Sequence, residues 1–542
     1  MAIVGESGSG KSVTALSILQ LLPSQTVRYP SGEILFSSDG NTVTDILHCN
    51  EQNLRSMRGN EVAMIFQEPM TSLNPVFTCG NQVMEAIQLH QQVKTSEAKQ
   101  KTIALFEKVK LPDPEQLFRK YPHQLSGGQK QRVMIAMAMS CELSLLICDE
   151  PTTALDVTVQ KKILQLLKDL QQTTRMGIIF ITHDLGVVAE LADRVIVMYK
   201  GAIVEAGDIQ SIFQQPQHPY TRSLLACRPV LHPPGKRLPV VSDFMNDSDD
   251  IQDYKNLQAI PGNKAVLPPT GHIYNPQANK KILLSARDLS VWFPIKKNIL
   301  GKPLEYLKAV DAVSFDVYEG ETLGLVGESG CGKTTLGRAL LRLIDSTSGR
   351  ILYKGIDLTA KKSTELKQLR KEIQIVFQDP YSSLNPRLTI GEALTEPMKV
   401  HDILKNYKQR RDKVVELLEK VNMKAEHLSR YPHEFSGGQR QRIVIARALA
   451  LNPSFIVCDE SVSALDVSVQ AQVLNLLNDL KREFGFTIIF ISHDLSVVRY
   501  ISHRIMVMNN GKIEELGLAE QVYHHPKQPY TQQLLASIPG RA

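Results

Sequence analysis

The stretch GESGSGKS, Gly5 to Ser12, decides the fold, and it returns as GESGCGKT, Gly327 to Thr334. Each copy has two glycines with four residues between them, followed by Lys and then Ser or Thr, which is the pattern of a phosphate-binding loop. Glycines are needed because the loop turns its backbone N–H groups inward around phosphates, and side chains there would block the approach. One copy could arise by chance in a glycine-rich turn. Two copies with matching surroundings indicate two nucleotide-binding domains.

The side chains of the two loops have distinct expected tasks. Lys11 and Lys333 reach the outer phosphates of a nucleotide, whereas Ser12 and Thr334 offer a hydroxyl to Mg²⁺. The helix that begins at this point directs its positive end at the anion. The residues that we expect to bind phosphate are Gly5, Ser7, Gly8, Gly10, Lys11 and Ser12, and in the second loop Gly327, Ser329, Gly330, Gly332, Lys333 and Thr334.

Length and composition limit the classes of protein. A chain of 542 residues is too long for one core and suggests two to four domains. The net charge of +6 is only a slight excess of basic residues, so the composition does not indicate a protein that binds nucleic acid through a basic surface. Apolar runs have strand length and are too short to span a membrane. From the scattered cysteines, and from opening residues that are not basic and then apolar, we expect a protein of the reducing cytosol and not a secreted one.

The two halves carry the same landmarks in the same order. Three pairs are separated by 310 residues and the glutamines by 311, whereas the two loop lysines are separated by 322. The first half therefore has about eleven extra residues between its lysine and its glutamine, which we place near Ser37 to Asn53 as a lengthened hairpin or loop. The pairs are Gln67 with Gln378, Ser126 with Ser436, Asp149 with Asp459, and His183 with His493.

Each half alternates short apolar strands with helical patterns, which predicts an α/β fold with a mostly parallel sheet and helices on its faces. Between the glutamine and the Ser-Gly-Gly landmark, Leu, Ile and Val recur at helical spacing, which predicts an inserted helical subdomain. These helical segments run from Gly80 to Lys120 and from Ile390 to Arg430. The clearest strands are Leu145 to Cys148 and Ile178 to Thr182, with Phe455 to Cys458 and Ile488 to Ser492 as their partners.

The predicted domains are residues 1–227 and 281–542, joined by a linker at 228–280 that is rich in Pro and contains the acidic run SDFMNDSDD. The run could dock a partner, but a solvated spacer is the favoured interpretation. Residues 282–322 have no counterpart in the first half, which starts within a strand at Met1. We expect that half to lack its first strands, through a misplaced start codon or a clipped chain.

Carboxylates follow one apolar strand in each half. Asp149 and Asp459 stand at the carboxyl end of a strand, facing the phosphate loop, where each can hold Mg²⁺ through water. The next residues, Glu150 and Glu460, can polarise a water for attack on the terminal phosphate. A single Asp-Glu pair would more often begin a solvated loop. Its repetition favours a catalytic role.

Two further features recur in both halves. His183 and His493 each follow a strand, from which an imidazole can contact the terminal phosphate, although a lone His there would more often be structural. LSGGQ and FSGGQ form a second glycine turn before a helix, which offers amides and a Ser hydroxyl to phosphate. These signature residues, which we expect to complete the nucleotide site of the other half, are Ser126, Gly127, Gly128 and Gln129, and Ser436, Gly437, Gly438 and Gln439.

These motifs resemble those of the ATP-binding cassette (ABC) family over almost the whole chain. FQEPMTSLNP and FQDPYSSLNP follow the glutamines, and HPYTRSLLA and QPYTQQLLA close the halves. They are similar to the oligopeptide, dipeptide and nickel uptake branch, and most to the fused two-cassette ATP-binding subunit of microcin C and oligopeptide-type importers. The fold that this implies is two tandem P-loop ABC ATPase domains.

The resemblance implies two ATP molecules sandwiched between head-to-tail cassettes, with Mg²⁺ in each site. Gln67 and Gln378 would contribute to the metal site and to catalysis, and would pass motion to the membrane subunits. Closure on ATP and opening after hydrolysis would drive transport. The implied partners are two separate transmembrane permease subunits and an extracytoplasmic solute-binding protein, at the cytoplasmic face of the bacterial inner membrane.

Departures from the family pattern raise further expectations. Phe293 is the candidate to stack on adenine, with Trp292 or Tyr306 as alternatives, and the first half has lost that position, so it should hold ATP poorly. Glu460 is followed by Ser461, whereas Glu150 is followed by Pro. Because the glutamate itself is retained, we expect ATP hydrolysis to survive this difference. Because only Cys227 stands after the PYT segment, no iron–sulfur cluster is expected.

Cys331 lies inside the second phosphate loop and has two interpretations. A helix N-terminus could lower the pKa of its thiol and make it reactive. A small residue tolerated at this position is the favoured alternative.

The competing function is a soluble tandem-cassette ATPase acting on ribosomes. Those proteins usually join their cassettes by a charged helical linker, whereas residues 228–280 are rich in Pro and lack periodicity. The cargo of an importer, whether peptide, microcin, glutathione or nickel, leaves little trace in this subunit.

Overall fold

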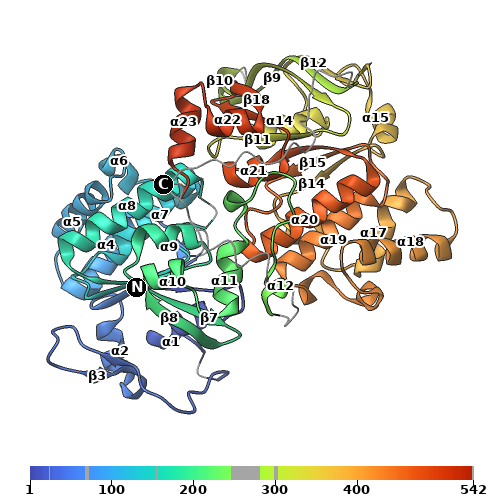
Figure 1. The fold of residues 1–542 in the computed structure, drawn as a ribbon. Helices are drawn as coiled ribbons and strands as arrows, with labels where there is room; N and C mark the ends of the chain where they lie inside the picture. Colours follow the sequence, from blue (N-terminus) through green and yellow to red (C-terminus); the bar gives the residue numbers. More distant parts are fainter. Residues whose placement is uncertain (24, 68–71, 154, 246–280, 298–302, 540–542) are drawn as a thin grey trace. The chain divides into compact units, whose positions relative to one another are not determined.

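The computed structural model describes residues 1–23, 25–67, 72–153, 155–245, 281–297 and 303–539. These residues form two compact units (Figure 1). The first unit contains residues 1–225, and the second contains residues 226–243 together with the described residues from 281 onwards. Most of the predicted linker, residues 246–280, lies outside the described part of the chain.

The central sheet of the first unit is mostly parallel, as predicted. Neighbouring strands are parallel except for the last pair, β7 and β8. Strand β1, which carries the phosphate loop at its end, lies between β6 and β7. In sheet order the strands are β4 (Val62–Ile65), β5 (Leu145–Asp149), β6 (Gly177–Thr182), β1 (Ala2–Val4), β7 (Arg194–Tyr199) and β8 (Ala202–Asp208).

The second unit repeats this sheet with the same order and directions. Its last pair, β17 and β18, is again antiparallel. The strands in sheet order are β14 (Ile373–Val376), β15 (Phe455–Asp459), β16 (Thr487–Ile491), β11 (Thr322–Val326), β17 (Arg504–Asn509) and β18 (Lys512–Leu518). Because the carboxyl ends of parallel strands meet at one edge, the phosphate loop and the Asp-Glu pair of each unit lie at the same edge.

Helices cover these sheets because the strands are apolar on both faces and must be shielded from water. In the first unit they are α1 (Lys11–Ile18), α2 (Glu51–Met57), α4 (Cys79–Gln91), α5 (Thr95–Lys108), α6 (Pro114–Phe118), α7 (Gly127–Ala138), α8 (Val157–Thr174), α9 (Leu185–Leu191), α10 (Ile209–Gln214) and α11 (Pro219–Ala226). Helices α4 to α6 occupy the segment predicted as a helical insertion.

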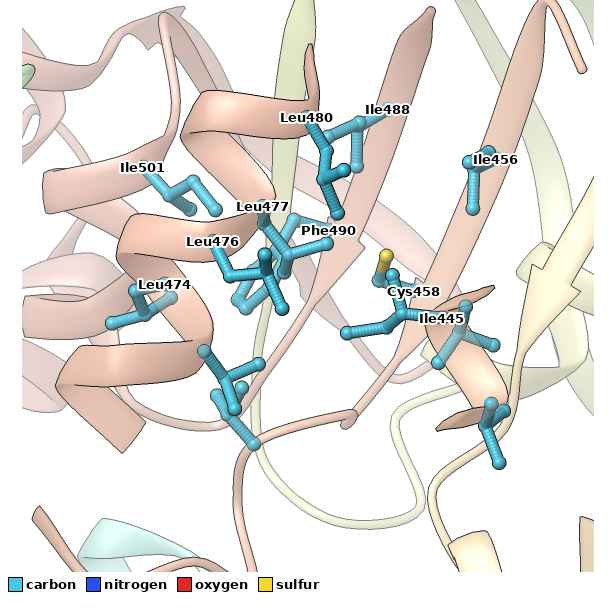
Figure 2. Close-up of a cluster of buried hydrophobic side chains, with 14 of the residues drawn as sticks. Ile445, Ile456, Cys458, Leu474, Leu476, Leu477, Leu480, Ile488, Phe490 and Ile501 are labelled. Carbon is cyan, nitrogen blue, oxygen red and sulfur yellow. The ribbon is translucent and has the colours of Figure 1, made fainter. Parts of the chain in front are cut away.

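The helices after residue 240 follow the same plan. They are α12 (Val241–Met245), α14 (Lys333–Leu340), α15 (Ser363–Leu369), α16 (Pro380–Ser383), α17 (Ile390–Val400), α18 (Tyr407–Lys420), α19 (Gly437–Leu449), α20 (Val467–Phe484), α21 (Leu495–Ile501), α22 (Ala519–His524) and α23 (Pro529–Ala536). Figure 2 shows how α20 supplies the core: Leu476, Leu477 and Leu480 project toward Phe490 and Ile488 of β16. None of the described helices is long and apolar enough to cross a membrane.

An antiparallel sheet distinguishes the second unit. Its strands, in order, are β10 (Pro303–Tyr318), β9 (Ile282–Lys297), β12 (Ser348–Tyr353) and β13 (Ile356–Asp357). Among the described residues of the first unit, the counterpart is a hairpin of β2 (Leu35–Phe36) and β3 (Thr44–Asp45). Its loop, residues 37–43, is longer than the loop at 354–355, and it lies where the sequence predicts a lengthened hairpin.

Residues 226–243, which we call the docked segment, pack onto the second unit. The amide of Leu238 donates to Asn475 Oδ1 at 2.9 Å, and Asn475 Nδ2 donates back to the carbonyl of Leu238 at 2.8 Å. The hydroxyl of Tyr500 donates to the carbonyl of Lys236 at 2.8 Å. Leu238 and Cys227 are both buried in the core of the unit. The first part of the predicted linker is therefore packed on the second unit. The acidic run, for which a solvated spacer was the favoured interpretation, begins at Ser242, which is exposed, and its residues 246–250 lie outside the described part of the chain.

Candidate active site

The backbone of each phosphate loop is closely packed at its base. A Cβ on Gly5 would lie 2.3 Å from the carbonyl oxygen of Met198, and a Cβ on Gly327 would lie 2.2 Å from that of Met508. Gly10, just before α1, has a φ of 101°, a left-handed conformation that disfavours other residues. The glycines at these positions are thus required by the local structure of the loop.

The lysine of each loop is buried and satisfied by the loop itself. Lys11 Nζ donates to the carbonyl oxygens of Gly5 and Glu6 at 2.8 and 2.9 Å, and the side chain is 4% exposed. Lys333 makes the same two contacts, to Gly327 and Glu328 at 2.8 and 2.9 Å. A buried ammonium inside a ring of backbone groups is suited to bind phosphate oxygens.

The hydroxyl that follows each lysine meets the strand-end aspartate. Ser12 Oγ donates to Asp149 Oδ1 at 3.0 Å, and Thr334 Oγ1 donates to Asp459 Oδ1 at 2.9 Å. Hydroxyl and carboxylate oxygens are the donors that Mg²⁺ prefers. The pairs brought together by the fold therefore fit the predicted metal site.

The glutamate beside each aspartate is contacted from two elements. Gln67 Nε2 donates to Glu150 Oε2 at 3.0 Å, and His183 Nδ1 lies 3.4 Å from Glu150 Oε1. In the second unit the corresponding distances to Glu460 are 2.8 Å from Gln378 Nε2 and 3.6 Å from His493 Nδ1. The fold thus gathers predicted residues that are up to 116 positions apart in the chain, as Gln67 and His183 are.

Adjacent carboxylates in each site have opposite pKa shifts. Burial raises the pKa of Asp149, and the neighbouring charge of Glu150 adds to the rise. Burial also opposes ionisation of Glu150, but His183, the hydrogen bond from Thr153 and the charge of Lys11 together outweigh it and lower the pKa of that carboxyl. Asp459 and Glu460 follow the same pattern. The glutamate is therefore ionised at neutral pH, as a base that accepts a proton from water requires.

The signature residues begin helices α7 and α19. The amide of Gln129 donates to Ser126 Oγ, and the Gln129 side chain accepts from the Ser126 amide, so each serine side chain caps its helix. Ser126 and Gly127 are exposed on the surface of the first unit, as Ser436 and Gly437 are on the second. The signature serine thus combines a structural capping role with accessibility.

The predicted adenine contact lies on β9 of the second unit. Phe293 is 38% exposed. The neighbouring Trp292 packs against Tyr306 of β10, with ring centroids 6.1 Å apart. Phe293 is therefore partly accessible, and its contact with adenine stays a prediction.

Of the two interpretations of Cys331, the structure contradicts the less favoured one, a lowered pKa of its thiol. The residue is 5% exposed, and burial raises the pKa of its thiol although Lys333 lies nearby. Burial disfavours the thiolate more than the helix N-terminus favours it. A small residue tolerated within the loop is the interpretation that the structure supports.

One contact to each phosphate loop was not predicted from the sequence. The amide of Glu6 donates to the hydroxyl of Tyr220 at 2.9 Å, and the amide of Glu328 donates to that of Tyr530 at 3.1 Å. Both tyrosines belong to the PYT segments, which served only as family markers. The sequence signal that could have indicated this contact is the PYT segment itself, which recurs at the matching place in both halves.

Each unit has a mostly parallel sheet, a phosphate loop at the end of a central strand and an Asp-Glu pair at the end of a nearby strand. This arrangement, present twice, defines a tandem P-loop nucleotide hydrolase. The chain belongs to the ABC transporter family, whose model, "ABC transporter", matches residues 1–153 and 310–463. A second model, "Oligopeptide/dipeptide transporter, C-terminal region", matches residues 204–252 and 515–541. The protein is thus an ABC-type ATPase, and the predicted family and fold class are confirmed.

Curated relatives match over nearly the whole chain. The "Glutathione import ATP-binding protein GsiA" of Escherichia coli strain K12 is 49% identical, over 99% of this chain and 84% of its own length. The protein of the same name from Pectobacterium atrosepticum is 48% identical, again over 99% of this chain and 84% of its own length. These relatives are import subunits, as the PYT endings predict, and they give no support to the ribosomal alternative.

Proposed function

We propose that this chain is the ATP-hydrolysing subunit of an importer for short peptides and peptide-like compounds, with glutathione as the first substrate to test. The observation that carries the proposal is the match of the oligopeptide-type C-terminal region to both halves. The names of the curated relatives support glutathione as the starting point.

In the proposed mechanism, each phosphate loop binds ATP through its backbone amides and its lysine. Glu150 and Glu460 accept a proton from the attacking water, since each carboxylate is ionised at neutral pH and is contacted by a glutamine amide. His183 and His493 hold the glutamates and contact the terminal phosphate. Phe293 stacks on adenine in the second half.

Mg²⁺ would be held in each site by oxygen donors of the loop, strand and glutamine. When bound, the ion neutralises charge on the phosphates. The residues proposed to hold it are Ser12, Gln67 and Asp149, and in the second half Thr334, Gln378 and Asp459. That this chain contains no iron–sulfur cluster stays a prediction.

Each ATP would also need the signature of the other half. The exposure of Ser126, Gly127, Ser436 and Gly437 supports this proposal, because it leaves these residues accessible to a nucleotide held by the other half. The proposed partners are two transmembrane permease subunits and an extracytoplasmic solute-binding protein, with this chain peripheral at the cytoplasmic face of the inner membrane.

Uptake in cells that lack this gene tests the proposal. Labelled glutathione, a dipeptide and Ni²⁺ would be supplied separately, and the gene would be restored as wild type or as Glu150→Gln/Glu460→Gln. We expect wild type alone to restore uptake of glutathione or the dipeptide. Unchanged uptake of both compounds on deletion, together with recovery of the chain on ribosomes and not on membranes, would contradict the proposal.

A further inference from the structure

A tyrosine from the C-terminal region of each half touches the phosphate loop of the same half. Tyr220, in α11, accepts from the Glu6 amide at 2.9 Å, and Tyr530, in α23, accepts from the Glu328 amide at 3.1 Å. These residues are more than 200 positions apart in the chain, so the contact depends on tertiary structure. Its occurrence in both units shows that it is a regular feature of this architecture.

The tyrosine and the lysine of the loop hold the two ends of one peptide group. The carbonyl oxygen of Gly5 accepts from Lys11 Nζ at 2.8 Å, and the amide of the same peptide bond, on Glu6, donates to Tyr220. When Lys11 turns to a phosphate, the contact to Tyr220 can remain. The tyrosine thus fixes the orientation of the first peptide of the loop independently of nucleotide.

The remaining surroundings of this peptide restrict its movement further. A Cβ on Gly5 would meet the carbonyl oxygen of Met198, which shows that the end of β7 presses against the loop. The next residue, Tyr199, packs its ring on Tyr220, with centroids 4.4 Å apart. Tyr220 is fully buried. Its hydroxyl is therefore held in place by packing and not by the loop alone.

A carboxylate on the edge strand sets the position of the tyrosine helix. Glu205, in β8, accepts from the amides of Gln217 and His218 at 2.7 and 3.1 Å, just before α11 begins. In the second half Glu515, in β18, accepts from the amides of Lys527 and Gln528 at 3.0 and 3.3 Å. The same edge strand thus anchors the helix that carries the tyrosine in both units.

We infer that Tyr220 and Tyr530 are positioning residues that orient the phosphate loops for ATP binding. This assigns a task to the PYT segments beyond marking the family. The inference rests on the proposal that these loops bind ATP, and it does not depend on which compound is imported.

The test is ATP binding to the full chain carrying Tyr220→Phe or Tyr530→Phe, which keep the ring and remove the hydroxyl. Tyr220→Phe is compared with its parent in a Lys333→Ala background, where the first loop alone binds, and Tyr530→Phe in a Lys11→Ala background. We expect the Kd for a fluorescent ATP analogue to rise about 5- to 30-fold, the usual effect of leaving a buried amide without its acceptor. The KM for ATP should rise in parallel while kcat changes less than about twofold, because the loop binds ground and transition states alike.

Tyr407→Phe is the matched control, since Tyr407 is 70% exposed at the start of α18. It should leave Kd and KM unchanged. A lowered melting temperature with unchanged Kd in both Tyr220→Phe and Tyr530→Phe would show a merely structural role and overturn the inference. Titration of the unsubstituted chain shows separately whether the loops bind ATP, so a failure of the nucleotide assignment is distinguishable.

Discussion

Glu150 and Glu460 combine a charged side chain with an unusual backbone. Their φ angles are 47° and 46°, in the left-handed region that non-glycine residues rarely adopt. Such a conformation costs about 1–3 kcal/mol and persists only where the surroundings enforce it. Here the amide of Glu150 donates to the carbonyl of Ile181 on β6, and that of Glu460 donates to Ile491 on β16. The backbone strain positions the carboxylate opposite the glutamine amide.

We expect Glu150→Gln and Glu460→Gln each to leave ATP binding intact and to reduce turnover strongly, by roughly 10²- to 10⁴-fold at the altered site. The amide has the shape of the carboxylate but accepts no proton. Steady-state ATP hydrolysis and equilibrium binding measure the two effects separately. Glu97→Gln, on the exposed face of α5, is the control. Unchanged turnover in both single variants would refute the assignment of the base.

For individual residues, the sequence predicted which side chains lie in the site better than it predicted which residues they contact. The Asp-Glu pairs, glutamines and histidines were identified from repetition, and the fold brings them together. The role of Tyr220 could not be read from the sequence, because nothing local to the PYT segment points to residue 6. The sequence left two interpretations of Cys331 open, because burial, which raises the pKa of its thiol, has no short-range signature.

In helix α19 the two glycines of the signature, Gly437 and Gly438, differ in the space around them. A Cβ on Gly438 would lie 2.3 Å from Val469 Cγ1 of α20, whereas a Cβ on Gly437 would meet only the end of the Leu465 side chain, at 3.9 Å. In α7 the contacts of Gly128 and Gly127 follow the same pattern. The second glycine therefore permits close packing of two helices, and the first has open space in front of it.

This difference predicts separable defects. Gly438→Ala should lower the melting temperature of the protein, because the methyl group forces α19 away from α20, with a cost of about 1–3 kcal/mol. Gly437→Ala should leave the melting temperature nearly unchanged and lower ATP turnover. Thermal unfolding and hydrolysis assays on the same preparations check both. Equal loss of stability in the two variants would contradict the assignment of packing to the second glycine alone.

The sequence predicted the central strands to within about a residue and the helical insertions by their periodicity. It did not predict β9 and β10, which form most of the antiparallel sheet. Their pairing shifts register at several places, for example between Val310 and Val313. Such irregularities interrupt the strict alternation by which a strand is recognised. Residues 282–322 were therefore identified as strands that the first half lacks, without their bounds or pairing.

At the scale of the whole chain, the docked segment links the sequence of the first half to the surface of the second unit. Its contacts are made by Asn475 and Tyr500. At the equivalent positions, 310 residues earlier, the first half has Gln165 and Glu190, which are exposed. The site that receives the segment is therefore specific to the second unit.

We expect the two halves to stay together after the chain is cut. A protease site would be inserted at residues 246–280, and the cleaved protein would be separated by size without nucleotide. The fragments should elute together, because residues 226–243 remain on the first fragment and bind the second. Leu238→Asp should release them, since an unpaired charge cannot be buried at that position without a large cost. Gln165→Leu should have no effect. Fragments that separate without any substitution would contradict the prediction.

Docking by residues 226–243 also bears on how the two halves of this chain are told apart. The two phosphate loops, GESGSGKS and GESGCGKT, are nearly identical, so they cannot distinguish one half from the other. The docked segment instead contacts Asn475 and Tyr500, where the first half has Gln165 and Glu190. These contacts thus mark the second half at residues outside its nucleotide site.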